Sequence, residues 1–538
     1  MKRGDNTGES GPEGAYTGGS AHEDTSGGRS LLASIGRVAG ASAVALVFGE
    51  IVSLAQTIAL ARLLSPAEIG IFVAGTVLTT LLGTFVEGGL RSGLIQREHD
   101  VADAAETVFR VTLIAGIAMS LGSLAAAPLI ASVFDSRTAG LVAAATSGLL
   151  LLHALSNVPE AMLQREFSVR RRLVVGPLVA VTYAVVAVGL AARGWGVWSM
   201  VAGTYASYLA LVVSVWLISS WRPGSGRASI AMWRTLARYG APLVFGMIGS
   251  RVQNATEAVV LGRGLSATDL GLFRYGQRIA RIPTMAIIEV GSVALFPAFS
   301  RIAGHLDRLV PAYLRALQWA IVLAAACSGL MIAVGPPAVV VVLGEPWRGV
   351  GPAVVALAGL SLGRACICVS EEIIKGRGRT GLLNWYTVSE VGLGLGLLLL
   401  LVGPFGLVGA ALSVSLTSIV VGIVVLALTM RVIPVSARAI CGAVLPPLPA
   451  AALATLAVWM LETGVMHTDS RPVLVAVAFL VVDVVVFGIA YLLLLTVFAR
   501  PVVFDAADLL LRIVRSRHRA ADAVPSPGVP VPFRDPEE

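Results

Sequence analysis

Charged side chains are scarce in this sequence of 538 residues. Asp, Glu, Lys and Arg together make up only 13% of it, whereas hydrophobic residues make up 56%. Soluble domains carry about 25% charged residues, so this composition excludes a soluble multidomain protein. The alternation of apolar and polar side chains over about ten residues that marks transmembrane β-strands is also missing. The composition therefore predicts an all-α integral membrane protein, in which each helix satisfies its own backbone hydrogen bonds.

Lysine is nearly absent, because Lys2 and Lys375 are the only two lysines. Arginine therefore supplies almost all of the positive charge behind the net charge of +8. A basic chain can bind nucleic acid, but in a membrane protein arginine anchors in the cytoplasmic loops account for such a charge. The sequence predicts no nucleic-acid partner.

Catalytic and metal-binding motifs are missing as well. The sequence has no glycine-rich phosphate loop, which excludes ATP hydrolysis by this chain. Its six histidines lack ligand spacing, and its four cysteines lie in or beside apolar runs, where we expect small buried hydrophobic residues. These cysteines are Cys327, Cys366, Cys368 and Cys441. Polytopic membrane glycosyltransferases are an alternative, but the sequence lacks their extended loop domains. We therefore predict no enzyme activity, no cofactor and no metal.

Long apolar runs recur from Val38 to Ala499. Each is long enough for a helix that crosses the hydrocarbon core of a bilayer, which takes about 20 residues. We predict about fourteen transmembrane helices, over residues 38–61, 69–90, 107–130, 139–161, 173–192, 196–219, 239–261, 271–297, 312–335, 350–374, 382–402, 405–429, 439–461 and 473–498.

One segment occurs twice in the chain. Leu60–Phe72 reads LARLLSPAEIGIF and Leu261–Phe273 reads LGRGLSATDLGLF, so the two copies are 273 − 72 = 201 residues apart. The same shift superimposes the apolar run 38–60 on the run 239–261. A repeat of this length indicates the duplication of a helical unit. It predicts two pseudo-symmetric lobes of six helices each.

A polar stretch that begins with Pro-Gly-Ser-Gly separates the sixth predicted span from the seventh and marks the boundary between the lobes. The two tails are poor in large apolar residues, which is typical of disorder. A basic amphipathic segment after Arg500 suits the anionic inner leaflet, and its alternative is a simple stop-transfer flank. The predicted parts are a disordered cytoplasmic tail (1–36), the N-terminal six-helix lobe (37–220), a cytoplasmic linker (221–238), the C-terminal six-helix lobe (239–430), helices 13 and 14 (431–500), and a cytoplasmic basic helix with a disordered tail (501–538).

Basic residues alternate between the loops. If the N-terminus is cytoplasmic, the even-numbered connections between spans hold two to four basic residues each, whereas the odd-numbered connections hold at most one. This alternation follows the positive-inside rule. It predicts that both termini lie in the cytoplasm.

Several charged residues lie inside predicted spans, where each costs about 2.5–3.5 kcal/mol unless a partner or a water-filled cavity surrounds it. Positions 274, 278 and 281 share one face of the eighth span because of their i, i+4, i+7 spacing. Guanidinium groups bind phosphate oxygens through paired hydrogen bonds, so convergent arginines predict a cavity for an anion. The predicted cavity residues are Arg251, Arg274, Arg278, Arg281, Arg364 and Asn254.

Three acidic residues inside predicted spans, Glu50, Glu257 and Asp483, are candidates for coupling or gating. At the 201-residue shift Glu50 falls on Arg251, so opposite charges occupy equivalent positions in the two lobes. An ion pair between them would favour one end state, and an anion that binds Arg251 would shift the balance. The alternative is that each charge pairs within its own lobe, for example Arg251 with Glu257.

Five motifs carry a resemblance to a known family. They are LARLLSPAEIGIF (60–72), GGLRSGLIQRE (88–98), LQREFSVRRRL (163–173), FPAFSRI (296–302) and LGEPW (343–347). In combination they resemble the bacterial polysaccharide transporters, the Wzx-type flippases of the multidrug/oligosaccharidyl-lipid/polysaccharide exporter (MOP) superfamily. The similarity extends from about residue 35 to about residue 435.

The resemblance implies a V-shaped, MATE-like pair of six-helix lobes around a central cavity, with two additional helices, in the bacterial cytoplasmic membrane. It also implies a flippase that moves a polyprenyl-pyrophosphate-linked oligosaccharide from the inner to the outer leaflet, driven by an ion gradient or the membrane potential. The implied partners are the lipid-linked oligosaccharide, membrane lipids, and the polymerase and glycosyltransferases of polysaccharide synthesis.

Three other functions fit the same pattern of spans and charges. A lipid II-type flippase differs in its substrate. A cation-coupled drug antiporter of the same fold would favour an acidic cavity over one lined by arginine, and in a non-transporting membrane scaffold the charges would be purely structural. The arginines inside the spans favour a flippase for an anionic lipid-linked sugar.

Overall fold

The computed structural model describes residues 48–87, 89–166, 171–290, 295–501 and 504. Every regular element within these ranges is helical, so the prediction of an all-α protein is confirmed for them. The predicted tail 1–36 lies outside the described residues. The first residues of the first predicted span and nearly all of the predicted region 501–538 lie outside them as well.

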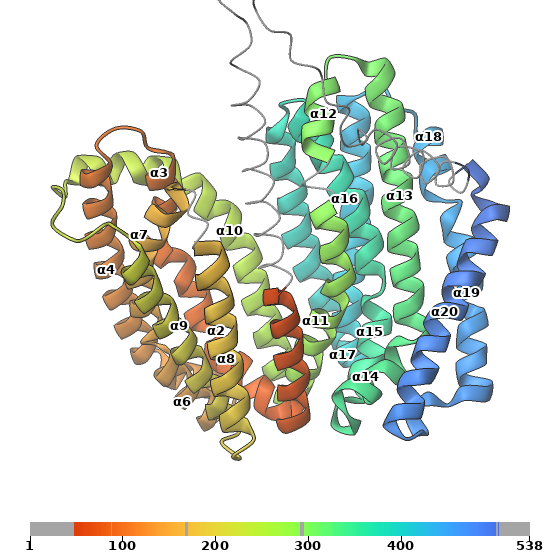
Figure 1. Cartoon of the computed structure of the whole chain (residues 1–538), viewed down its shortest axis with the longest axis horizontal. Helices are drawn as coiled ribbons and strands as arrows, with labels where there is room; N and C mark the ends of the chain where they lie inside the picture. The colour runs from red at the N-terminus through yellow and green to blue at the C-terminus, as the bar shows by residue number, and fades with distance from the viewer. Residues whose placement is uncertain (1–47, 88, 167–170, 291–294, 502–503, 505–538) are drawn as a thin grey trace, which may run out of the picture.

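The N-terminal lobe forms one half of the molecule (Figure 1). Its first described helix covers residues 48–63. The following helices are α2 (Pro66–Glu87), α3 (Leu90–Gln96), α4 (Val101–Ala125), α5 (Ala127–Val133), α6 (Arg137–Thr146), α7 (Leu149–Arg165), a π-helical turn (Arg171–Val175), α8 (Gly176–Ala191) and α9 (Val197–Ile218). Within the lobe α2 packs against α6, α4 against α7, and α8 against α9.

The C-terminal lobe forms the other half. Its helices are α10 (Ile230–Gly264), α11 (Ala267–Val290), α12 (Phe296–Ile302), α13 (Leu306–Ala333), α14 (Gly335–Leu343), α15 (Val350–Leu357), α16 (Gly359–Gly376) and α17 (Leu383–Val432), with 3₁₀ turns at Glu345–Trp347 and Thr380–Leu382. The backbone of Gly406 is left-handed, with φ of 54°, and this kink divides α17 into two helices. The kink lies at the boundary between the predicted spans 382–402 and 405–429.

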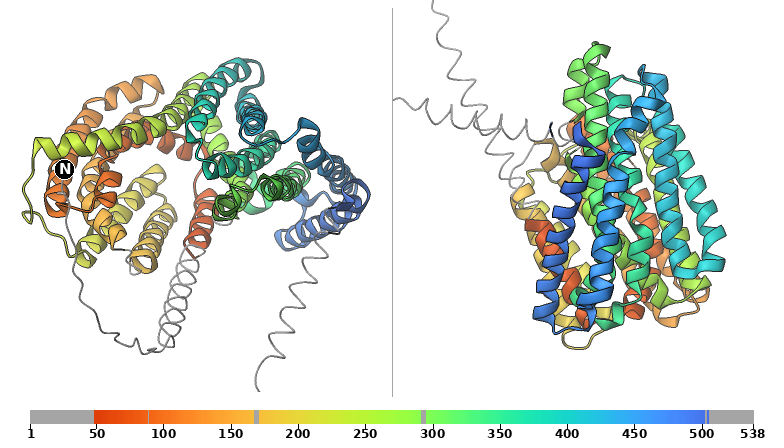
Figure 2. Two further views of the ribbon diagram at one scale, coloured as in Figure 1. Left: turned by 90° about the horizontal axis from the view of Figure 1, so that it is seen from above. Right: turned by 90° about the vertical axis from the view of Figure 1, so that its right-hand side faces the viewer.

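Three more helices, α18 (Ala437–Val444), α19 (Pro447–Leu461) and α20 (Val473–Phe498), pack on the side of the C-terminal lobe that faces away from the N-terminal lobe (Figures 1 and 2). α19 contacts α13, and α20 contacts α13 and α14. The buried ring of Phe487 joins α20 to this cluster. These helices widen the C-terminal lobe without entering the space between the lobes.

Within the part of the chain that the structure describes, ten helical segments are long and apolar enough to cross a membrane. Each predicted span from 69–90 onward overlaps one helix or two consecutive helices. α10 and α11 are not among the ten, and both carry the charged and polar side chains described below. The segment Trp385–Val432 counts once although two spans are predicted in it. The multi-pass helical architecture is therefore confirmed, whereas the count of fourteen stays a prediction.

The predicted linker 221–238 is shorter in the structure. α10 begins at Ile230, where the hydroxyl oxygen of Ser229 accepts a hydrogen bond from the backbone N–H of Met232 (3.1 Å). Ahead of that cap, the backbone N–H of Gly224 donates to Glu106 (2.7 Å), which ties the linker to α4. The arginines after residue 229 break the apolar run, so the sequence pattern places the start of the helix too late.

The two copies of the repeated segment meet at one end of the molecule, where α10 ends and α11 begins (lower part of Figure 1). A Cβ atom on Gly70 would lie 1.7 Å from the carbonyl oxygen of Ala267, and one on Gly271 would lie 2.0 Å from that of Pro66. The backbones of α2 and α11 therefore touch at two glycines that the 201-residue shift relates. We call this contact region, residues 62–70 and 263–271, the repeat end.

Two arginines cross between the lobes at the repeat end. Arg62 donates to the carbonyl oxygens of Val342 (2.9 Å) and Val341 at the C-terminus of α14. Arg263, its equivalent in the second copy, donates to the carbonyl oxygen of Val133 (3.1 Å) at the C-terminus of α5. Cations are favourable at helix C-termini, where carbonyl groups lack intrahelical partners. Each lobe thus contributes one arginine that caps a helix of the other.

Candidate functional site

Three adjoining pockets run from one lobe to the other. The N-lobe pocket (about 340 Å³) lies among α2, α7, α8 and α9, the inter-lobe pocket (about 280 Å³) lies between α2 and the pair α10 and α11, and the C-lobe pocket (about 470 Å³) lies among α10, α11, α16 and α17. Arg251, Thr76 and Thr80 line both the N-lobe and the inter-lobe pockets. Asn254 and Arg281 line both the inter-lobe and the C-lobe pockets.

The inter-lobe pocket is cationic. Three of the predicted cavity residues, Arg251, Arg274 and Arg281, line it together with Asn254, and none of the described residues around it is acidic. The remaining lining comes from five residues of α2 and from Ala255. Three guanidinium groups that converge on one small pocket favour an anion with several oxygen acceptors.

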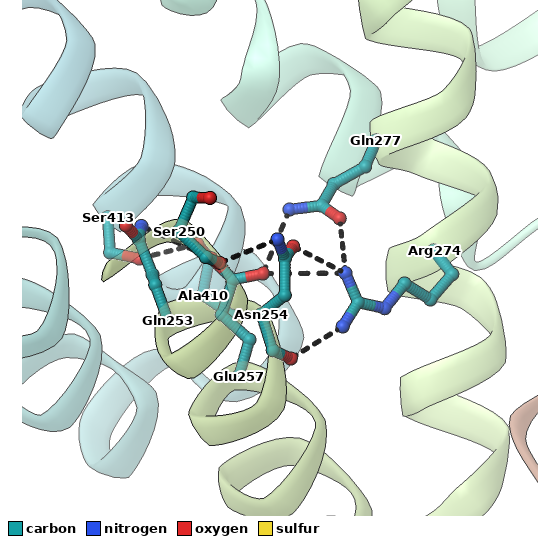
Figure 3. A network of polar contacts seen from close by, with 8 residues as sticks. All are labelled: Ser250, Gln253, Asn254, Glu257, Arg274, Gln277, Ala410 and Ser413. Carbon is teal, nitrogen blue, oxygen red and sulfur yellow. Dashed lines mark hydrogen bonds and ion pairs between the residues drawn. The ribbon is translucent and has the colours of Figure 1, made fainter. Parts of the chain in front are cut away.

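A hydrogen-bond network fixes the orientation of Arg274 (Figure 3). Its Nη2 donates to the carbonyl oxygen of Asn254 (2.8 Å), and its Nη1 donates to Gln277 Oε1 (3.0 Å) and lies 3.5 Å from Glu257 Oε2. Glu257 is only 4% exposed and also accepts hydrogen bonds from Gln277 (3.2 Å) and Gln253 (3.4 Å). α10 supplies Gln253, Asn254 and Glu257, and α11 supplies Arg274 and Gln277, so the network joins these two helices.

In the C-lobe pocket the charges are balanced. Arg364 of α16 forms an ion pair with Glu390 of α17, with 2.6 Å between Nη2 and Oε1. Glu257 and Arg281 line the same pocket. Glu390 is a residue that the sequence analysis missed, although it lies in a predicted span where an acidic side chain needs a partner. Arg364 therefore lines the C-lobe pocket with its charge neutralised by a carboxylate, and its role in binding an anion stays a prediction.

Arg278 does not line any of the three pockets. Its Nη2 donates to the hydroxyl oxygen (2.7 Å) and the carbonyl oxygen (3.2 Å) of Ser53 in the helix over 48–63. In this structure Arg278 therefore does not join Arg274 and Arg281 in a pocket, and its place in the anion cavity stays a prediction. Helical periodicity places positions 274, 278 and 281 on one face of α11. The helix over 48–63 lies against part of that face, so the Arg278 side chain extends to Ser53 while Arg274 and Arg281 extend to the inter-lobe pocket.

The predicted coupling residues fall in three different places. Glu257 lies in the polar network beside Arg274, and Glu50 is exposed and lines none of the three pockets. Among the described residues neither Glu50 nor Glu257 forms an ion pair with Arg251, so the cross-lobe pair is absent from this conformation. Asp483 is fully buried on α20, within the cluster of α13, α19 and α20 and away from the pockets. Their roles in coupling stay predictions.

The N-lobe pocket is lined by residues that the sequence analysis did not select. Five threonines, two tyrosines, a histidine and Arg251 supply its polar surface. A signal for them exists, because Thr76, Thr80 and Thr84 follow one another at four-residue intervals along an otherwise apolar helix. His153, which lies inside the fourth predicted span, belongs to the same lining.

The chain matches a known protein family. A family model described as "Polysaccharide biosynthesis protein" matches residues 59–352, which is more than half of the chain.

Two curated proteins are similar in sequence. The succinoglycan biosynthesis transport protein ExoT of Rhizobium meliloti (strain 1021) is 28% identical over 334 residues, which is 61% of this chain and 66% of that protein. The lipopolysaccharide biosynthesis protein WzxC of Escherichia coli (strain K12) is 23% identical over 334 residues, which is 60% of this chain and 66% of that protein. The chain thus matches just under two thirds of the length of these relatives.

Solved structures of other membrane transporters are similar in fold, and two of them show the likeness. A structure of the lipid II flippase MurJ in an inward closed conformation aligns with 86% of this chain and 99% of its own, with a TM-score of 0.68 at 13% identity. An inward-facing multidrug resistance MATE family transporter of the MOP superfamily aligns with 73% of this chain and 98% of its own, with a TM-score of 0.55 at 18% identity. At these identities the likeness concerns the fold, and it confirms the expected MATE-like architecture.

Proposed function

The chain belongs to the polysaccharide biosynthesis protein family of membrane transporters, and on this basis we propose that it flips a polyprenyl-pyrophosphate-linked oligosaccharide. The substrate is a precursor of a cell-surface polysaccharide, and it moves from the inner to the outer leaflet by alternating access. The two sequence relatives, named for succinoglycan transport and lipopolysaccharide biosynthesis, support this class of substrate.

The observation that carries the proposal is the inter-lobe pocket. Arg251 and Arg281 line it, and Arg274 is held there by Asn254 and Gln277. A pyrophosphate offers several anionic oxygens, and each guanidinium can bind two of them in parallel. The three arginines replace the water that the pyrophosphate loses inside the membrane. A drug cation would gain nothing from this surrounding, because the described lining has no carboxylate.

The position of the pocket suits a lipid-linked substrate. It lies between the lobes, beside α2 and the pair α10 and α11. The polar head group crosses through this space while the apolar polyprenyl chain stays in the bilayer. The predicted orientation, with both termini in the cytoplasm, places the multi-pass chain in the cytoplasmic membrane next to the enzymes that assemble its substrate on the inner leaflet.

Transport in proteoliposomes tests the proposal. The probe is a fluorescent polyprenyl-pyrophosphate-linked oligosaccharide, and the measured quantity is the rate at which it becomes accessible on the opposite leaflet. A hydrogen bond to a charged group contributes about 1.5–3 kcal/mol, so Arg251→Ala and Arg281→Ala should each slow flipping about 10- to 150-fold.

Arg227→Ala is the matched control, because this exposed arginine lies in the linker and lines none of the three pockets. It should flip the probe at the wild-type rate. Wild-type rates in both pocket variants would refute the arginine site. A wild-type protein that leaves the lipid in place but moves an organic cation would identify a drug antiporter instead.

A further inference from the structure

We propose that the N-lobe pocket binds the sugar attached to the pyrophosphate. This inference rests on the proposed function and assigns the two parts of the substrate to two different pockets. Phosphate oxygens meet the arginines of the inter-lobe pocket, and the neutral, hydroxyl-rich sugar occupies the pocket enclosed by α2, α7, α8 and α9.

The hydroxyl groups of the N-lobe pocket are suited to a sugar. Thr76 donates its hydroxyl hydrogen to the carbonyl oxygen of Phe72 (2.8 Å), and Thr204 donates to that of Met200 (2.8 Å). With their hydrogens engaged inside their own helices, these oxygens keep lone pairs that accept hydrogen bonds from a ligand. A sugar carries many hydroxyl donors, whereas the ionised pyrophosphate diester of the proposed substrate carries none.

Most of the other lining residues are uncharged. None of the described residues around the N-lobe pocket is acidic, and Arg251 is its one arginine, at the border with the inter-lobe pocket. The rings of Phe72, Tyr183 and Tyr208 supply flat apolar surface, which the C–H face of a sugar ring can cover. The C-lobe pocket is different, because the charged pair of Arg364 and Glu390 lies in it.

The residues that line both pockets show that the proposed sugar site lies directly beside the proposed pyrophosphate site. Arg251, Thr76 and Thr80 belong to both linings, so the two pockets adjoin and are close enough for one ligand to contact both. The N-lobe volume of about 340 Å³ lies at the small end of ligand pockets. It accommodates the first part of an oligosaccharide, while the rest extends outside it.

The test compares two probes on the purified full-length protein. One is the lipid-linked oligosaccharide extracted from cells that lack the transporter, and the other is polyprenyl pyrophosphate without sugar. The double variant Thr84→Val/Thr204→Val removes two hydroxyls that line only the N-lobe pocket. The ratio of its affinity for the oligosaccharide probe to its affinity for the sugar-free probe should fall by about 5-fold or more. Its affinity for the sugar-free probe should stay at the wild-type value.

Thr235→Val is the control, because Thr235 is exposed on α10 and its hydroxyl donates to its own helix (3.0 Å). Tyr183→Phe provides a second, milder variant in case the double variant folds poorly. An unchanged preference, or an equal loss for both probes, overturns the sugar site and leaves the proposed function standing. If neither probe binds the wild-type protein, the proposed function itself fails and the sugar site fails with it.

A second, independent observation concerns the repeat end, and its geometry points to a reversible gate. Arg62 and Arg263 are related by the repeat, and each caps a helix of the opposite lobe through exposed hydrogen bonds. Between them the backbones of α2 and α11 touch at Gly70 and Gly271. Exposed helix-end contacts are individually weak. The buried core beside them joins Leu60 and Leu64 to Leu270 and Trp347, and the indole N–H of Trp347 donates to the carbonyl oxygen of Ala61 (2.7 Å), so the two arginines hold the exposed part of this contact.

Labelling of a cysteine at position 267 tests the gate, since Ala267 lies directly against Gly70. In a Cys441→Ser background, a membrane-impermeant thiol reagent should react about 3- to 30-fold faster when Arg62→Gln and Arg263→Gln are combined. Arg348→Gln is the control, because its partners Glu345 and Asp469 are not in the N-terminal lobe. An unchanged rate in the double variant would show that the two arginines do not hold the lobes together.

Discussion

Removal of the Glu257 carboxylate provides a sharp test of the polar network behind the inter-lobe pocket. The carboxylate is 4% exposed and lies 3.5 Å from Arg274 Nη1. Loss of one partner from a buried ion pair costs about 3–5 kcal/mol. Arg274 keeps acceptors in the carbonyl oxygen of Asn254 and in Gln277 Oε1, and the ion pair is long, so we expect Glu257→Ala to cost about 1–3 kcal/mol.

A double-mutant cycle on thermal unfolding measures this coupling. Glu257→Ala leaves a guanidinium without its carboxylate, whereas Glu257→Ala/Arg274→Ala removes both charges. The double variant should therefore melt at or above the temperature of the Glu257→Ala single variant. If the losses of the two single variants simply add, Glu257 and Arg274 do not interact in the folded protein, and the explanation of how Arg274 is oriented is wrong.

A different substitution of Glu257 tests the proposed anion site. Glu257→Gln preserves the shape of the side chain but removes the negative charge that partly offsets Arg274. The affinity of the purified protein for inorganic pyrophosphate should then rise, as measured by calorimetry, whereas Arg274→Gln should lower it. A fall in affinity for Glu257→Gln would mean that the carboxylate holds the arginine in place more than it competes with the anion.

Three further predictions concern other parts of the chain. Arg348 hydrogen-bonds the Glu345 carboxylate and holds the pKa of Glu345 below its ordinary value. This contribution is present above the ordinary pKa and is lost as the pH falls through the lowered one, so the difference in melting temperature between wild type and Arg348→Gln should shrink at acidic pH. Asp483→Leu should raise the melting temperature, because the buried Asp483 carboxyl lies beside the Glu462 carboxylate and no described N–H or O–H donor reaches its oxygens; a lower value would show that the contact between Asp483 and Glu462 stabilises the fold. A reporter fused at Arg227 should be cytoplasmic and one at Met466 external, and the opposite result would invert the assigned orientation.

Composition and the repeated segment are enough to predict a helical membrane protein built from a duplicated unit. Apolar runs long enough for a bilayer permit only helices that satisfy their own backbone groups, and the structure confirms helices throughout the described ranges. The duplicated segment identified the equivalence of Gly70 and Gly271 before any contact was known. The arginines that line the inter-lobe pocket were also identifiable, because a charge inside a predicted span needs a cavity or a partner.

Which of those charged side chains contact one another depends on how the helices pack, and the sequence does not give this. Arg278 shares a helix face with Arg274 and Arg281, yet it is exposed and donates to Ser53 of the helix over 48–63. Arg364 pairs with Glu390, which lies 26 residues away in sequence. The spacing of residues predicts which side chains share a face of one helix. It does not predict which other helix packs against that face. For this reason the arginine site was predictable in kind, whereas its members and the hydroxyl-lined pocket beside it emerged only from the assembled lobes.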